Sequence, residues 1–189
     1  MVEETAAVVR KNDRRSIMRI MSDPRFPVGA FSFKPFASES ERQSAIAEIR
    51  DLPRKLKVAL ASLGYDKIDT HYREGGWTVR QLVHHIADSH MNGYIRFRLG
   101  LTEEKPMVKP YDEKAWAELP DSKLPVDHSV AILENLHHRW TVMLELTPAE
   151  AFSRELVHPD HGSMTLDHVL QMYAWHGRHH VAHITNTPR

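Results

Sequence analysis

Four histidines lie within eight residues near the C-terminus, in the stretch Trp175-His176-Gly177-Arg178-His179-His180-Val181-Ala182-His183. Residues four positions apart on a helix share a face, so the imidazoles of His176 and His180 can point to one place. This spacing is typical of metal ligands. It constrains the fold because two inward-facing imidazoles need partners for four ring nitrogens within a helical core. A divalent ion satisfies one nitrogen of each ring, and the groups around the ion satisfy the others.

A second group of histidines follows Trp77 and offers a third ligand: His84, His85 and His90. At about 100° per residue, His90 falls in the middle of the apolar face of the helix predicted here, and His85 falls on its flank. Periodicity alone therefore favours His90, although a lone inward histidine is often only a hydrogen-bonded core residue. His85 begins a polar ridge suited to a wet pocket, at spacings of four, three and four residues: Ser89, Asn92 and Arg96. The residues alone leave the third ligand open.

The chain has fourteen histidines and no cysteine, so imidazole and carboxylate are the metal ligands available to it. Lys and Arg number 25, as do Asp and Glu, and no excess positive charge attracts nucleic acid or anionic lipid. No apolar run reaches the about 18 residues that span a bilayer, and the N-terminus lacks the order of a signal peptide. We expect a cytoplasmic protein without nucleic-acid or membrane partners.

Apolar residues recur at helical spacing in four long segments, and no strand alternation of useful length appears. The helices are expected over about 40–63 and 79–101, then from Asp127 as N-cap, and last from Thr165. Two pairs with capping-box spacing precede the first two helices: Ser38 with Glu41, and Thr78 with Gln81. Four amphipathic helices with long connections predict an all-α fold, an antiparallel four-helix bundle.

We expect residues 1–23 to form a loose N-terminal extension and residues 24–189 to form a single domain. Aromatic residues alternate with proline and glycine from Phe26 to Phe36, which predicts an ordered, extended arm. The connection over 102–125 contains four prolines around a short helical pattern at 112–119. A connection of this length within a compact domain is usually functional or mobile.

Three histidine ligands without a fourth protein ligand describe a catalytic metal site, because positions stay open for water or substrate. A divalent ion in such a site lowers the pKa of bound water towards about 7, or it activates an external thiol as thiolate. The chain has no His-Glu-x-x-His motif, no glycine-rich phosphate loop and no Gly-x-Ser-x-Gly turn. The usual zinc-protease, nucleotide-binding and serine-hydrolase arrangements are therefore absent.

Several of these segments together resemble the DinB-like superfamily, and within it the YfiT type of metal-dependent hydrolases, which is related to bacterial thiol S-transferases. The resemblance covers roughly residues 25–186. The residues that carry it are Trp77-Thr78-Val79-Arg80-Gln81-Leu82-Val83-His84-His85-Ile86-Ala87-Asp88-Ser89-His90, Tyr94-Ile95-Arg96-Phe97, Pro110-Tyr111-Asp112-Glu113-Lys114-Ala115-Trp116 and the run from Trp175 to His183.

The resemblance implies a four-helix bundle, a cytoplasmic homodimer and one divalent ion per subunit, zinc or nickel. In the family pattern the first ligand lies eight residues after the tryptophan, which is His85 here, and the other two are His176 and His180. This choice overrides the preference of periodicity for His90. The family usually begins later in the chain, so Met21 is a second candidate for the initiating residue.

The first functional prediction is a hydrolase in which His85, His176 and His180 hold an ion that activates water on a small-molecule substrate. One alternative is a transferase in which the same ion activates an external low-molecular-weight thiol of the bacillithiol type. Another is a metal-binding helical module without enzymatic activity. Arg96 is a candidate substrate contact because its planar fork matches a carboxylate. No residue is assigned as general acid or base, and the substrate is not identified.

Overall fold

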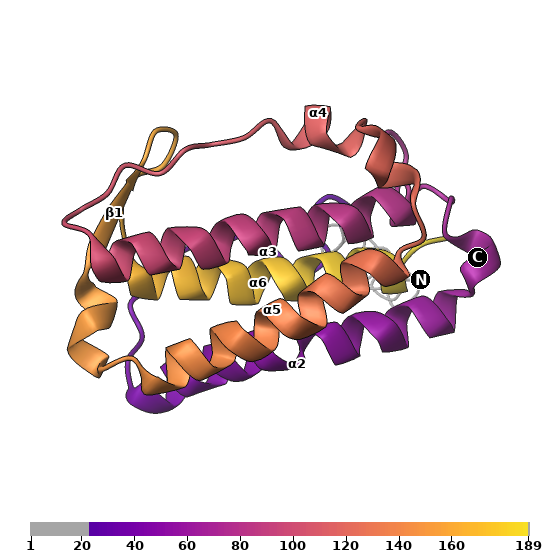
Figure 1. Cartoon of the computed structure of the whole chain (residues 1–189). Coiled ribbons are helices and arrows are strands. Elements are labelled where there is room, and N and C mark those ends of the chain that lie inside the picture. Colours follow the sequence, from indigo (N-terminus) through magenta and orange to yellow (C-terminus); the bar gives the residue numbers. More distant parts are fainter. Residues whose placement is uncertain (1–22, 189) are drawn as a thin grey trace, which may run out of the picture.

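The structure is a computed structural model that describes residues 23–188. Four long helices form the body of this part of the chain (Figure 1): α2 (Glu39–Leu63), α3 (Val79–Thr102), α5 (Asp127–Leu146) and α6 (Leu166–Thr185). The predicted four-helix bundle is confirmed. Residues 1–22 lie outside the described residues and include Met21 and nearly all of the predicted extension. The division into an extension and one domain stays a prediction.

The helices do not follow one another around the bundle in chain order. Helix α2 packs against α5 and α6, and α3 packs against the same two helices, so α2 and α3 lie across the bundle from each other. Figure 1 shows α2 and α6 running in one direction and α3 and α5 in the other. The antiparallel neighbours are thus α2 with α5 and α3 with α6. The long connection from α3 to α5 returns along the bundle, which makes these two consecutive helices parallel.

The ends of the helices follow the capping residues of the sequence, with one shift. Thr78 and Gln81 form a full capping box at the start of α3, and the Thr165 side chain accepts from the His168 N–H at the start of α6. Ser38 caps α2, but the Glu41 carboxylate accepts from Ala37 rather than from Ser38. The prediction that Asp127 is the N-cap of α5 was wrong by one residue. The N-cap is Val126, which makes no side-chain cap.

Shorter elements lie in the connections. The connection from α3 to α5 carries α4 (Glu113–Ala117) and the 3₁₀ turn η2 (Pro120–Lys123), and two further 3₁₀ turns are η1 (Tyr65–Lys67) and η3 (Ala149–Ser153). No strand alternation of useful length was visible in the sequence, but β1 (Glu155–His158) pairs with β2 (Gly162–Thr165) in a short antiparallel hairpin. Each strand has only four residues, too few for alternation to be recognised.

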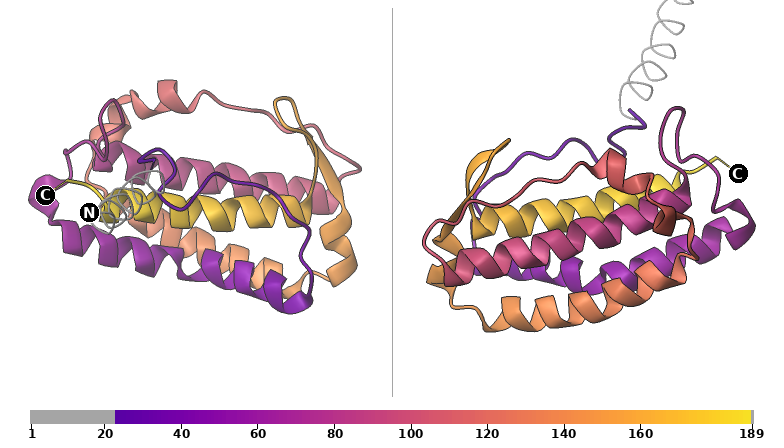
Figure 2. Two further views of the ribbon diagram at one scale, coloured as in Figure 1. Left: turned by 180° about the vertical axis from the view of Figure 1, so that it is seen from behind. Right: turned by 45° about the horizontal axis from the view of Figure 1, so that its top comes forward.

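The segment before α2 is an extended arm along α6, as predicted (Figure 2). The Trp175 Nε1–H donates to the Gly29 carbonyl over 3.1 Å, and Lys34 exchanges two backbone hydrogen bonds with the Gln171 side chain. Phe33 stacks on His168 with ring centroids 4.4 Å apart. The arm therefore covers a face of α6 that would otherwise be open.

Two apolar clusters fill the bundle. We call them the Trp140 cluster, which also contains Ile49, Tyr94, Phe97 and Tyr173, and the Leu56 cluster, which also contains Leu52, Ile86, Ala87, Leu133 and Ile184. Trp140 and Leu56 are fully buried. Among the described residues, no helix has the length and apolar character needed to cross a membrane.

Candidate metal centre

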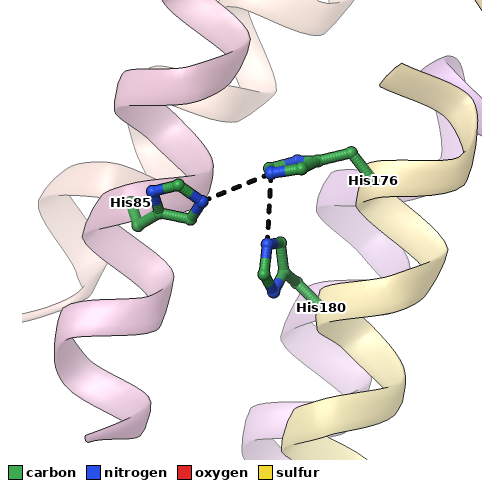
Figure 3. A group of neighbouring side chains, drawn as sticks. All are labelled: His85, His176 and His180. Carbon is green, nitrogen blue, oxygen red and sulfur yellow. Dashed lines mark hydrogen bonds between the residues drawn. The ribbon is translucent and has the colours of Figure 1, made fainter. Parts of the chain in front are cut away.

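Three imidazoles from two helices point to one another (Figure 3): His85 on α3, and His176 and His180 on α6. The Nε2 atom of His176 lies 3.3 Å from Nε2 of His85 and 3.1 Å from Nε2 of His180. His85 and His180 are buried and His176 is partly buried. The structure thus brings the two histidines of the i, i+4 pair together with the one that the family pattern selects.

A close approach of α3 and α6 makes this possible. Gly93 of α3 faces the ring of Tyr173, and a Cβ atom at this position would lie 2.4 Å from the ring. Only a residue without a side chain lets the tyrosine pack so near the α3 backbone. At the other side of the site, the Trp77 ring packs against His85 with centroids 4.7 Å apart. These contacts hold the rings of the two helices at a fixed separation.

The three rings are neutral at physiological pH. Burial lowers the pKa of His85 to about 4, and it also lowers the pKa of His176 and of His180, with a further contribution from neighbouring histidines. A neutral imidazole has one N–H and one lone pair, and the lone pair is the metal ligand. The site therefore offers three ligand nitrogens without the cost of removing protons.

The hydrogen bond made by Nδ1 of His180, the nitrogen that faces away from the site, shows which ring nitrogen of His180 carries the proton. His183 Nε2 lies 3.1 Å from the Pro24 carbonyl, which only accepts, so this nitrogen donates. The Nδ1 atom of His183 then accepts from Nδ1–H of His180 over 3.2 Å. The remaining nitrogen of His180, Nε2, has its lone pair directed at the site. Such an outer partner is the usual companion of a metal-bound histidine.

The geometry fits a divalent ion. In a tetrahedral shell with Zn–N distances of about 2.0–2.1 Å, neighbouring ligand nitrogens are about 3.3 Å apart. The two contacts of His176 Nε2, at 3.3 and 3.1 Å, agree with this separation. Unlike Nδ1 of His180, the Nδ1 atom of His85 is buried without a hydrogen-bond partner among residues 23–188. Three protein nitrogens leave at least one position open for another ligand.

A second trio is also compact enough for an ion: His179, His180 and His183. It shares His180 with the first trio, but there the Nδ1 atoms of His180 and His183 are engaged with each other in a hydrogen bond. The Nδ1 atom of His179 is buried and has no hydrogen-bond partner in the described part of the chain. The first trio is the better site because its three Nε2 atoms face one another, whereas the second trio would need a nitrogen that is already engaged in the hydrogen bond between His180 and His183.

Two cavities meet at the histidines. A cleft of about 660 Å³ is lined by His85, His176 and His180 together with Trp77, Trp175 and Glu113. A neighbouring cavity of about 670 Å³ is lined by His176, Ser89, Arg96, Tyr111, Glu113 and Tyr173. Of the predicted polar ridge, Ser89 and Arg96 line the second cavity. Asn92 lines neither, because its side chain donates to the Asp88 carbonyl.

The sequence left two aspects of the site unrecognised. His137 of α5 is buried in the bundle and was not singled out, although it lies four residues after Leu133 and three before Trp140, on the apolar face. The burial of His179 was not recognised either. This ring stacks on Trp175 with centroids 4.4 Å apart, and Phe26 of the arm covers it at 6.3 Å.

Comparisons with known proteins agree with these features. Residues 48–184 match the model of the DinB superfamily. Proteins of Bacillus cereus (strain AH820) and Bacillus anthracis (strain A0248) that bear the name "putative metal-dependent hydrolase" are 52% identical over 166 residues, which cover 88% of this chain and 96% of theirs. Among solved structures, YfiT from Bacillus subtilis is described as a probable metal-dependent hydrolase with an unusual four-helix bundle topology. It is 46% identical, superposes with a TM-score of 0.83, and the match covers 87% of this chain and 95% of that one.

Proposed function

This chain belongs to the DinB superfamily, and we propose that it is a metal-dependent hydrolase whose divalent ion is held by His85, His176 and His180. The observation that carries the proposal is the convergence of three neutral imidazoles at a cleft with room for a small-molecule substrate. Zinc and nickel both suit imidazole ligands. A bound divalent ion in such a site supplies water that is deprotonated near neutral pH.

The chain's own residues give the substrate its surroundings. Glu113 is the first residue of α4, and Asp112 caps this helix by accepting from two backbone N–H groups. The Glu113 side chain lines both cavities beside the histidines. The Glu113 side chain is exposed, but desolvation by the atoms around it still raises the pKa of its carboxyl above its usual range. A carboxyl group with a raised pKa is suited to accept and return a proton. We assign Glu113 as the general base and acid.

Arg96 is the proposed contact for a negatively charged end of the substrate. Its guanidinium donates to the Lys109 carbonyl over 3.0 Å and lies 3.5 Å from the Tyr173 hydroxyl, which leaves further N–H donors at the edge of the cavity. The Arg96→Ala variant should raise KM for an anionic substrate or thiol while the metal content stays the same. Arg98→Ala is a matched control, because Arg98 lies on the same helix and its side chain donates to Tyr94 instead.

A substrate panel tests the proposal. Activated esters and amides are offered to zinc-loaded and nickel-loaded protein, with and without added low-molecular-weight thiols. Turnover without thiol that is lost in His176→Ala supports the hydrolase. An absolute requirement for thiol contradicts it and favours the transferase, since the cysteine-free chain supplies no thiol of its own. Tight metal binding without turnover of any substrate favours the metal-binding module.

A further inference from the structure

The bundle contains a layer of polar rings between its two apolar clusters. His90 on α3 and His137 on α5 are 0% and 1% exposed. His90 lies between Ala87 of the Leu56 cluster and Tyr94 of the Trp140 cluster, and His137 likewise separates Leu133 from Trp140. Buried polar groups reduce stability unless they are hydrogen-bonded, and a leucine would fill either position without this cost.

These rings form one chain of hydrogen bonds that ends at the candidate metal centre. The Nδ1 atom of His137 is bonded to the Ile49 carbonyl of α2. Its Nε2 atom lies 3.0 Å from Nδ1 of His90, and Nε2 of His90 lies 3.2 Å from Nδ1 of His176. The chain therefore crosses all four long helices, from the backbone of α2 to a ring on α6.

The direction of every hydrogen bond follows from the first one. A carbonyl only accepts, so Nδ1 of His137 donates to Ile49, and in the neutral ring Nε2 must accept. His90 then donates from Nδ1 and accepts at Nε2, and His176 donates from Nδ1. The one nitrogen of His176 that is left with a lone pair is Nε2, the atom that faces His85 and His180. Burial, which lowers the pKa of His137 to about 4, keeps that ring neutral.

We propose that His90 and His137 are positioning residues that fix His176 in the Nδ1–H tautomer, so that its Nε2 lone pair is presented to the metal ion. This inference rests on the proposed metal site and goes beyond it, because it gives two core residues without contact to the ion a role in metal affinity. It also explains why the sequence offered both His85 and His90 as candidates for the third ligand. The two rings contact opposite nitrogens of His176, one on the metal side and the other on the outer side.

The tautomers can be read directly in metal-free protein labelled with ¹⁵N-histidine. Long-range ¹H–¹⁵N correlation spectra at neutral pH distinguish Nδ1–H from Nε2–H rings, and single-histidine variants assign the signals. We expect His90, His137 and His176 all to be Nδ1–H. A neutral Nε2–H ring or a charged ring at any of the three positions would overturn the proposal.

Zinc affinity, measured by competition with a coloured chelator, tests the consequence. His90→Phe removes the acceptor of the His176 proton, and loss of such an outer partner lowers metal affinity by about 10–100-fold. His137→Phe should lower it less, and His90→Gln should recover part of the loss because its amide oxygen can accept in the same place. Unchanged affinity in both phenylalanine variants would contradict the proposal.

His84→Phe is the matched control. His84 is also a buried histidine of α3, and it is bonded to Ser129 and to the Leu124 carbonyl, away from the metal centre. Its replacement should lower the melting temperature while zinc affinity stays within about two-fold, well below the effect of a lost outer partner. An equal loss of affinity in this variant would mean that packing, not tautomer, is responsible. If native protein binds no zinc, the proposed function fails, whereas the metal-free spectra still decide the tautomers.

Discussion

The buried histidines make the stability of the metal-free protein sensitive to acid. Burial lowers the pKa of His137 and of His85 to about 4, against about 6.5 for histidine in an unfolded chain. Between pH 6.5 and 4 the unfolded state therefore binds more protons than the folded state, and stability falls as the pH falls. Above pH 6.5 this contribution to stability is fully present.

The size of the effect follows from the difference in pKa. One pKa unit corresponds to about 1.4 kcal/mol. A pKa of about 4 in the folded state, against about 6.5 in the unfolded chain, therefore lowers the free energy of unfolding by about 3 kcal/mol between pH 7 and 4 for His137 alone. His85 contributes a similar amount. Since domains of ordinary stability unfold with only about 5–15 kcal/mol, these two rings alone remove a large share of it.

Denaturant titrations of chelator-treated protein at pH 7.0, 6.0 and 5.0 measure the free energy of unfolding. In His137→Leu the free energy of unfolding should decrease less steeply as the pH is lowered, by up to about 1.4 kcal/mol per pH unit, because one proton fewer is taken up on unfolding. His138→Leu, which removes an exposed histidine of the same helix, is the control and should keep the native slope. A native stability that does not change from pH 7 to 5, or a His137→Leu slope equal to the native one, would refute the reasoning.

Three further predictions concern the scaffold. Gly93→Ala places a Cβ 2.4 Å from the Tyr173 ring and should cost about 1–3 kcal/mol of unfolding free energy, measured by denaturation, whereas tolerance of alanine would show that the helices can separate. Arg42→Ala removes the fork of two bonds, 2.7 and 3.0 Å, that joins α2 to Asp167 of α6, and should cost about 1.5–3 kcal/mol in the same assay. The apolar arm and the proline-rich connection lead us to predict a two-fold dimer, so light scattering at low micromolar concentration should give twice the mass of one chain; the mass of one chain would refute this.

Local signals in the sequence were sufficient for most of the fold. Thr78 and Thr165 begin α3 and α6 because their side chains cap backbone N–H groups that the helix leaves free. The hairpin was missed because it pairs two strands of four residues whose partners are set by contact, not by periodicity. The parallel course of α3 and α5 depends on where a long connection runs, and helical periodicity carries no information about this.

The site was predictable only in part for the same reason. Helical phase places His90 in the middle of the apolar face and His85 on its flank, but it does not say which nitrogen of His176 each ring meets. The burial of His179 depends on Phe26, more than 150 positions earlier in the chain, so the α6 pattern alone could not reveal it. His137 carried a usable signal, since it repeats the spacing of its apolar neighbours Leu133 and Trp140.

The most direct test of the metal site is the metal content of purified protein after stripping and reloading with zinc, measured by atomic spectroscopy. The account predicts one ion per chain in the native protein and loss of that ion in each of His85→Ala, His176→Ala and His180→Ala, with full occupancy in His84→Ala. Full occupancy in His85→Ala together with loss in His90→Ala would contradict the account and make His90 the third ligand.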